Sequence, residues 1–551
     1  MRRHAWGREA YKTKLGAPSP FSPPLSRRSG TFSSATPAVP SPSLRGEPVL
    51  PWILEPFLLR NFPPFDFTVD WYTRFVSFFN MKTSSTLLAA ALFYQGAAAL
   101  PCKGSSAVCG AADWVGPTPV KIAGRADPAP SAFPGAEGFG RNAIGGRTGK
   151  VYKVTNLESV PLLPHLPLCL LLLVLTSWPS DSGTGSLRDA VSQPNRIVVF
   201  DVGGVIKIDA RIVVSKNIYI AGQTAPGGGI TVYGNGFSWS NANEAIVRYI
   251  RIRMGKPGDS GKDAITIADG KSLIFDHLSV SWGRDETFSI SGDVSNVTIS
   301  SSIISQGLET HSCGGLMQTD GGVSLFRNLY IDNKTRNPKV KGVNDFQNNV
   351  IYNWGGGGGY IAGDSEGASY ANIINNYFIS GPSTSVTAFT RGNANFRGYV
   401  KDNFYDSNRD GALNGAALCV STTCYSNMAI QTTPFDYPAP AKLLTPDEAV
   451  AHVVSKVGAS IARDAVDTAL VKELTSYGKS GKLISDEASM GGVGTIEAGT
   501  AKKDTDGDGI PDEWETANGL NPDDASDGMK IGAGGYANLE IYVNSLAPAV
   551  Y

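Results

Sequence analysis

Short apolar runs recur through the middle of the chain, from Ile197 to Tyr405, and they limit the fold more than any other feature. Their spacing is roughly 20 to 28 residues, the length of one coil in a solenoid. If such coils stack, equivalent side chains lie above one another, and amides can hydrogen-bond along the stack. An asparagine recurs in four of the runs, at Asn328, Asn349, Asn376 and Asn403. The pattern predicts an all-β solenoid of parallel coils.

An antiparallel sandwich with irregularly spaced turns is the alternative fold. The two-residue hairpin signals that such a sandwich needs are missing between the runs, which weighs against it. We place the solenoid at residues 132–440. After Lys442, Thr445 can cap a helix and apolar residues recur at helical spacing. Residues 441–500 are therefore expected to form a helical tail that packs on the solenoid.

The front of the chain has the composition of a processed segment rather than of a fold. Residues 1–80 are rich in Pro, Ser and Arg and lack periodicity, so we interpret them as disordered or as a gene-model extension. Residues 81–100 have a lysine, a short apolar stretch and small residues, which is the form of a secretory signal peptide. Residues 101–131 are interpreted as a linker. The protein is expected to be secreted, without a membrane anchor.

A proline-flanked apolar block at 159–180 differs from the polar, glycine-rich segments on either side. Its apolar core from Leu166 to Leu175 is about half the length of a helix that spans a bilayer, which needs about 20 residues. We interpret it as a translated retained intron that would leave the solenoid as a poorly ordered loop.

Charge and cysteine content narrow the function classes. The chain has 48 Lys and Arg residues against 49 Asp and Glu residues, so no basic surface for nucleic acid is indicated. Cys102 lies close to Cys109, and Cys419 lies close to Cys424, which makes two local disulfides plausible. We expect a monomer.

Three charged clusters fall on successive predicted coils, and a solenoid would bring them side by side. Any single acid among them is best explained as a solvated turn residue, but the concentration of acids and bases suggests a site. Carboxylates at a loop crossing suit calcium. His277 is expected to orient a turn, and Trp282 either stacks on a sugar ring or lies in the core. The clusters comprise Asp259 and Asp263; Asp276, His277, Arg284, Asp285 and Glu286; and Arg336, Lys339 and Lys341.

Several motifs occur in one order along the chain: AFPGAEGFG from Ala132, SLRDAV, FDVGGVIKI, IAGQTAPGGGITVYG, VRYIRIRMG, DHLSVSWGRDETFSI and RNPK. Together they resemble the pectate lyases of the parallel β-helix polysaccharide lyase superfamily. The resemblance runs from about Ala132 to the helical tail, and only 159–180 interrupts it. It implies a right-handed parallel β-helix and a calcium-dependent β-elimination on polygalacturonate.

The resemblance also implies roles for individual residues. Arg336, which lies two residues before a proline, matches the proposed base. Asp263 and Asp285 match calcium ligands, with Asp259 and Glu286 as neighbours, and Lys339, Lys341 and Arg284 are expected to bind substrate. Many relatives carry an arginine where this chain has Lys341, which cannot form a bidentate pair with a carboxylate. An arginine loses its proton reluctantly, so Lys339 or Lys341 is the alternative base.

Other activities remain open on the sequence. A pectin lyase acting on methyl-esterified chains needs no calcium, and Asp263 and Asp285 argue against it. A β-helix hydrolase would need carboxylates arranged for acid and base catalysis on one coil. A non-catalytic carbohydrate-binding β-helix would tolerate the loss of Arg336.

A second motif lies within the last segment, 501–551, in the run DTDGDGIPDEWE. It fits every ligand position of a twelve-residue EF-hand loop, and the alternative is an acidic surface turn. We interpret it as a structural calcium site. The predicted ligands are Asp504, Asp506, Asp508, Ile510, Asp512 and Glu515.

Two sequons permit N-glycosylation on a secretory route. They begin at Asn296 and Asn333. The second is adjacent to Arg336 and would crowd the cleft, so Asn296 is the better candidate.

Overall fold

The structure is a computed structural model that describes residues 130–157, 181–310 and 313–549. The predictions for 1–80, for the signal peptide 81–100, for Cys102 and Cys109 and for the block 159–180 lie outside the described residues.

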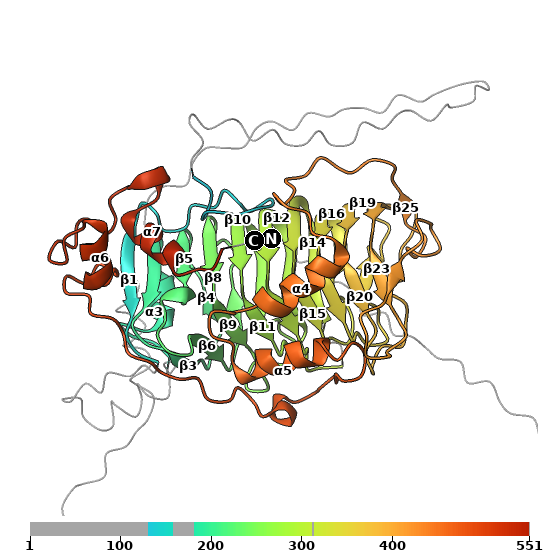
Figure 1. Cartoon of the computed structure of the whole chain (residues 1–551), viewed down its shortest axis with the longest axis horizontal. Coiled ribbons are helices and arrows are strands. Elements are labelled where there is room, and N and C mark those ends of the chain that lie inside the picture. Colours follow the sequence, from blue (N-terminus) through green and yellow to red (C-terminus); the bar gives the residue numbers. More distant parts are fainter. Residues whose placement is uncertain (1–129, 158–180, 311–312, 550–551) are drawn as a thin grey trace, which may run out of the picture. The chain divides into compact units, whose positions relative to one another are not determined.

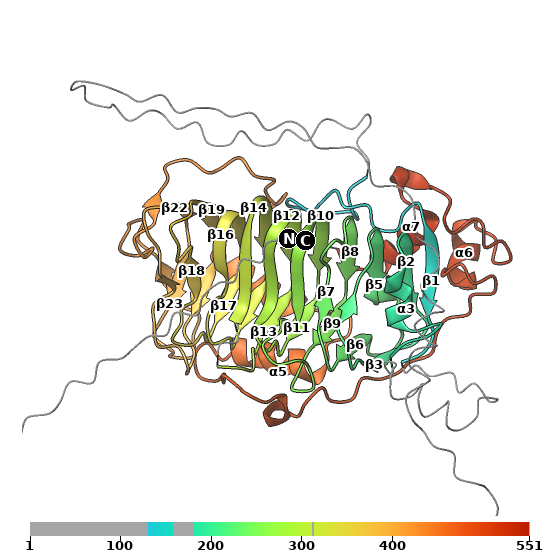
Figure 2. The same cartoon turned by 180° about the vertical axis from the view of Figure 1, so that it is seen from behind.

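The described chain winds through stacked parallel strands in two large sheets (Figures 1 and 2). The predicted all-β solenoid is confirmed. The described strands of the larger sheet are β1 (Lys150–Val154), β2 (Arg196–Phe200), β4 (Ile212–Val213), β5 (Ile218–Ala221), β7 (Phe237–Ser238), β8 (Ala245–Arg248), β10 (Ile265–Asp276), β12 (Glu286–Ser300), β14 (Cys313–Phe326), β16 (Lys339–Gln347), β18 (Tyr360–Ala362), β19 (Ser369–Ile374), β21 (Phe389–Thr390), β22 (Phe396–Lys401) and β25 (Ala429–Ile430).

The second sheet lies on another side of the coils, and its strands alternate in sequence with those of the first. Every strand pair in it is parallel except the pairing of β23 with β24 at its end. Its described strands are β3 (Gly204–Lys207), β6 (Ile230–Tyr233), β9 (Ile250–Arg253), β11 (Ser279–Ser281), β13 (Ile303–Ser305), β15 (Leu329–Ile331), β17 (Val350–Tyr352), β20 (Tyr377–Ile379), β23 (Phe404–Asp406) and β24 (Ala416–Ala417).

The first two apolar runs are the single strands β2 and β5, and from β8 onward each apolar run is two strands joined by a sharp turn. In four successive coils the residue before the repeated asparagine has a left-handed backbone, which breaks the run and sends the chain into the second sheet. Asparagine and aspartate tolerate this conformation better than most residues. The four residues are Arg327 (φ 58°), Asn348 (φ 58°), Asn375 (φ 53°) and Asp402 (φ 49°).

The repeated asparagines form the predicted ladder inside these turns. The side-chain amide of Asn328 donates to Asn349 Oδ1 at 3.1 Å, Asn349 donates to Asn376 Oδ1 at 3.1 Å, and Asn376 donates to Asn403 Oδ1 at 2.8 Å. All four asparagines are fully buried. Because each amide also serves backbone groups of its neighbours, the ladder satisfies the polar atoms that the turns would otherwise bury unpaired.

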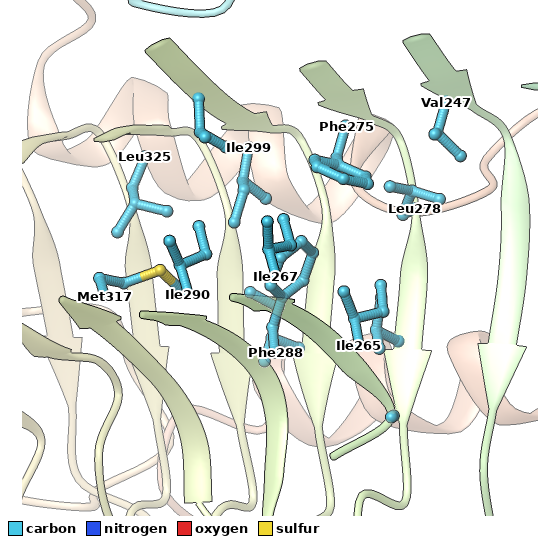
Figure 3. Packing of buried hydrophobic residues seen from close by; sticks show 14 of the residues in the cluster. Val247, Ile265, Ile267, Phe275, Leu278, Phe288, Ile290, Ile299, Met317 and Leu325 are labelled. Carbon is cyan, nitrogen blue, oxygen red and sulfur yellow. The ribbon is translucent and has the colours of Figure 1, made fainter. Parts of the chain in front are cut away.

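The interior is filled by apolar side chains stacked in register (Figure 3). Val247 pairs with Phe275, Phe275 with Ile299, and Ile299 with Leu325 on adjacent strands of the larger sheet. All four are fully buried. One column of in-register side chains thus runs along the stack, so a shift of one residue in any coil would remove it from the core.

Helices cover parts of the outside of the coils (Figure 1). The tail forms a helix with the predicted Thr445 cap, and it packs against the outer side chains of the second sheet. The described helices are α3 (Leu187–Ser192), α4 (Pro446–Lys456), α5 (Ala465–Leu474), α6 (Asp512–Asn518) and α7 (Asn538–Ser545), with 3₁₀ turns η1 (Gly222–Thr224), η2 (Glu487–Met490) and η3 (Ala533–Gly535).

Buried ion pairs hold α5 against the second sheet. Arg253, on β9, is fully buried and donates to Asp464 at 2.8 Å and to Asp467 at 2.9 Å. Asp464 also caps the first turn of α5. Removing either partner would leave a buried charge uncompensated, so the pair specifies where the helix docks.

Cys419 and Cys424 form a disulfide, as predicted, with an S–S length of 2.05 Å. No helix within the described residues is long and apolar enough to cross a membrane.

Replacing Asn349 with Ala should lower the free energy of unfolding by about 3 kcal/mol, because Asn328 and Asn376 each lose a buried partner. Urea denaturation followed by circular dichroism measures the change. The matched control is Asn395→Ala, whose exposed side-chain amide donates to the Glu366 carbonyl and to no other described residue. It should cost less than about 1 kcal/mol. Equal losses in the two variants would contradict a structural role for the ladder.

Candidate active site

Acidic side chains gather where β10 and β12 begin. Asp285 and Glu286 stand at the start of β12, and Asp263 lies just before β10 on the preceding coil. The Glu286 amide donates to Asp263 Oδ1 at 3.1 Å, and the Asp285 amide donates to the Lys262 carbonyl at 2.9 Å. Parallel stacking thus places three carboxylates at one corner of the solenoid.

The corner has the donor set for a hard cation. Carboxylate oxygens of Asp285 and Glu286 and the sulfur of Cys313 lie within 4.8 Å of one another. Burial, followed by the nearby Asp285 and Asp263, raises the pKa of the Cys313 thiol, so it stays protonated and is a poor metal ligand. The remaining donors are oxygens, which fit calcium.

Two residues predicted for this site have other surroundings. Asp259 is exposed in the turn before β10. Neither Asp259 nor Asp263 belongs to the metal-capable group, although the Asp263 carboxylate accepts from the Glu286 amide. Arg284 donates to Glu309 at 2.8 Å and to the Gly258 carbonyl at 2.6 Å. Its guanidinium therefore holds two loops together, and its role in substrate binding stays a prediction.

Arg336 lies two coils beyond the acids and is held from both sides. The Gly315 amide donates to the Arg336 carbonyl at 2.8 Å, and the Asn337 amide donates to Gly359 at 2.8 Å. A Cβ at Gly314 would lie 2.6 Å from the Arg336 carbonyl, so this close approach requires glycine. The backbone at Arg336 is left-handed (φ 55°), and such conformations concentrate at functional sites.

The Arg336 side chain meets the acidic corner directly. Its guanidinium forms an ion pair with Glu286. Burial lowers the pKa of Arg336; Asp285 opposes this effect and Arg391 adds to it. The structure thus brings Arg336 to the adjacent residues Asp285 and Glu286, from which it is 50 or more residues away in sequence.

A row of cations continues from Arg336 along neighbouring coils. Lys339 pairs with Asp364 at 3.0 Å, and Arg391 pairs with the same carboxylate at 3.2 Å. Lys341, on β16, forms no ion pair with any described residue. Burial lowers the pKa of Lys341, and Lys339 adds to that effect. The row can bind a polyanion.

Asp364 and Arg391 were missed in the sequence. Each follows a short strand of the larger sheet, β18 and β21 respectively. These strands are only two or three residues long, so no periodicity marks them. The residues in register with Lys339 are Ile361 and Thr390, so no charged column marked Asp364 or Arg391 in the sequence.

Three further predictions concern buried residues. His277 lies in a turn, as predicted. Its Nδ1 lies 2.9 Å from Asp276 Oδ2, and its ring stacks on the ring of Tyr249. Trp282 is fully buried and belongs to the core.

Asn333 is also fully buried, and its amide donates to the Ile304 carbonyl at 2.9 Å. Its sequon is therefore closed to glycosylation in the folded protein, whereas Asn296 is partly exposed and stays a prediction.

The acids of the carboxyl-terminal segment form two overlapping groups. Asp504, Asp506 and Asp508 form one group, and Asp508, Glu515 and Asp527 form the other. Burial, followed by repulsion between these acids, raises the pKa of Asp508 and of Glu515 to about 7.

Asp512, predicted as a ligand of this loop, faces other donors. Its carboxylate accepts from the Thr505 amide at 2.7 Å and from Lys503 Nζ at 2.6 Å. Asp512 belongs to neither group, and its role as a ligand stays a prediction. Asp527, which lies outside the twelve-residue loop, takes part instead.

Known proteins match most of the chain. A probable pectate lyase C from Aspergillus fumigatus is 66% identical over 420 residues, which are 76% of this chain and 94% of that protein. The probable pectate lyase C of Emericella nidulans is 63% identical over 420 residues, with the same shares of the two chains. The chain belongs to the pectate lyases. It is a polysaccharide lyase on a parallel β-helix.

No protein-family model matches this lyase. A solved structure of the major allergen from cedar pollen is 17% identical and gives a TM-score of 0.42, covering 59% of this chain and 92% of that one.

Proposed function

We propose that this lyase cleaves polygalacturonate by β-elimination with calcium, and that Arg336 is the base. The observation that carries the proposal is the contact between Arg336 and Glu286 at the meeting point of an acidic corner and a row of cations. Polygalacturonate carries one carboxylate on every sugar, and the row offers matching charges at Lys339, Lys341 and Arg391.

The acidic corner supports the calcium requirement. Asp263, Asp285 and Glu286 would hold the ion, which would neutralise the uronate carboxylate and so acidify the proton on the adjacent ring carbon. A fully methyl-esterified chain has no carboxylate to share with such an ion. Pectate is therefore a better substrate for this site than esterified pectin, which is the alternative.

The chain's own groups account for the proton and the orientation of the substrate. Arg336, in its neutral form, takes the proton from the ring carbon next to the carboxylate. The electrons of that C–H bond form a carbon–carbon double bond, and the glycosidic oxygen leaves and is protonated by solvent. Partial burial favours the neutral guanidine that this step needs. Lys341 is the second candidate base, because burial lowers its pKa as well.

Secretion is part of the proposal. The Cys419–Cys424 disulfide supports an oxidising destination, since disulfides persist mainly outside the cytosol.

Replacing Arg336 with Ala should lower kcat about 1,000-fold, as expected for the loss of a general base, and leave KM nearly unchanged. The ultraviolet absorbance of unsaturated uronate follows the reaction. Lys401→Ala, at an exposed position on β22, is the control and should keep the full rate. A full rate in Arg336→Ala with a lost rate in Lys341→Ala would move the role of base to Lys341.

Chelation should abolish the absorbance rise with polygalacturonate, and added calcium should restore it. Asp285→Asn should raise the calcium concentration needed for half-maximal rate by about tenfold or more, because it removes a charged ligand. The rate is measured across a calcium titration on both polygalacturonate and methyl-esterified pectin. Activity that persists in chelator and prefers the esterified chain would identify a pectin lyase instead.

Arg391→Ala should raise KM for polygalacturonate about tenfold with little change in kcat, because it removes a cation from the row without touching the base. Initial rates across a substrate titration measure both constants. Lys216→Ala, an exposed lysine on an early coil, is the charge-matched control and should leave KM unchanged. A loss confined to kcat would contradict a binding role for Arg391.

A further inference from the structure

Three acids of the carboxyl-terminal segment are buried, unlike the residues of a solvated turn. Glu515 is 0% exposed, Asp508 2% and Asp527 6%. Carboxylates are rarely found this deep unless they are paired or bind a metal. Their surroundings therefore decide what they do.

The hydrogen bonds of these acids leave one side of the cluster without donors. Asp508 Oδ1 accepts from the Ile510 amide at 2.9 Å, and Asp527 Oδ2 accepts from the Asn521 amide at 3.0 Å. The other oxygens find no hydrogen-bond partner among the described residues. These unpartnered atoms are Asp506 Oδ2, Asp508 Oδ2, Glu515 Oε1, Glu515 Oε2 and Asp527 Oδ1.

The nearby lysines form ion pairs with acids outside the buried cluster. Lys153 pairs with Asp504 at 2.9 Å, Lys503 with Asp512 at 2.6 Å, and Lys530 with Asp524 at 3.5 Å. Within the described part of the chain, no lysine or arginine pairs with Asp508, Glu515 or Asp527. The negative charge of the cluster thus lacks a protein counter-charge.

We propose that Asp506, Asp508, Glu515 and Asp527 form a calcium site separate from the catalytic corner, and that Asp527 completes it from outside the twelve-residue loop. The unpartnered atoms are all carboxylate oxygens, with no nitrogen or sulfur, which selects a hard cation over zinc or copper. Their number suits calcium, which takes six to eight oxygen ligands, better than magnesium, which keeps several waters.

The backbone is shaped for this approach of Asp527. A Cβ at Gly528 would lie 2.0 Å from Asp508 Oδ2, so only glycine lets the turn bring Asp527 against the loop. The Asp527 carbonyl accepts from Asn538 Nδ2 at 3.0 Å, and the Gly528 carbonyl accepts from the Leu539 amide at 2.8 Å. The turn that supplies Asp527 is therefore tied to the start of α7.

The ion would join three segments that together cover the first coils. The loop carries Ile510, which is fully buried in one apolar cluster with Val199 of β2, and α7 adds Leu539 and Val543 to the same cluster. Glu540 of α7 pairs with the buried Arg147 at 2.8 Å. Figure 2 shows α6 and α7 beside β1, β2 and β5. The bound ion thus fastens the carboxyl-terminal segment onto this end of the solenoid, and its function is structural.

Thermal melting of the full-length chain in calcium and in chelator tests the site without using lyase activity. Wild type and Asp285→Asn should both melt at a higher temperature in calcium, since the catalytic corner is a separate site. Asp527→Asn should lose more than half of that rise and bind calcium about tenfold or more weakly in titration calorimetry. Asp523→Asn, four residues away and exposed, is the control and should behave as wild type.

Wild-type protein alone provides a second measurement if Asp527→Asn does not fold. In chelator, trypsin should cut after Lys502 or Lys503 and release the carboxyl-terminal segment, and calcium should slow this cut about tenfold or more, as judged by mass spectrometry. A full calcium-dependent rise in melting temperature in Asp527→Asn would overturn the proposal. So would equal proteolysis of the wild type in calcium and in chelator.

Discussion

The structure depends on one constraint: every coil must stack on the next in a fixed register. In the four coils from Asn328 to Asn403, the left-handed turn and the asparagine behind it enforce this, because each buried amide can satisfy its neighbours only when the coils are aligned. The apolar column of the core and the asparagine ladder require the same register. A shift of one coil by one residue would therefore disrupt both the core packing and the hydrogen bonds of the ladder. Fixed register then places side chains from distant parts of the sequence at one corner. The contact between Arg336 and Glu286, 50 residues apart, exists because two intervening turns leave no freedom to the coils.

Much of the fold could be predicted because the repeat is written in two independent ways, in apolar runs and in asparagines. The ladder from Asn328 to Asn403 followed from spacing alone. The spacing did not predict that a run is divided into two strands. The residue at the turn, such as Arg327 or His277, has a left-handed backbone that its residue type does not indicate. The docking of α5 was also hidden. Arg253 lies in a run that pointed to a strand, and nothing local indicated that its charge would be buried against a helix more than 200 residues later.

Site residues could be predicted from the sequence where the type of residue alone suggests the chemistry. They could not be predicted where their role depends on which side chains they contact. Asp285, Glu286 and Arg336 meet as expected. Arg284 and Asp512 have the right type and spacing, but local partners occupy them, and a sequence does not show which of several neighbours a flexible side chain will choose. Arg391 and Asp527 were missed for the opposite reason. No sequence motif surrounds them, and only the folded coils and turns bring them close to the other site residues.

The ion pair between Arg336 and Glu286 bears directly on how an arginine can serve as a base. Pairing with a carboxylate favours the charged guanidinium, whereas burial disfavours it, so the two effects on its pKa oppose each other. As the proposed base, Arg336 would lose its proton more readily if Glu286 turned away from it while the burial remained. Glu286 is also one of the carboxylates suited to a cation at the corner, and Arg391 repels any positive charge that Arg336 retains. The same carboxylate that restrains the base at rest would release it once engaged elsewhere, which couples occupancy of the corner to the basicity of Arg336.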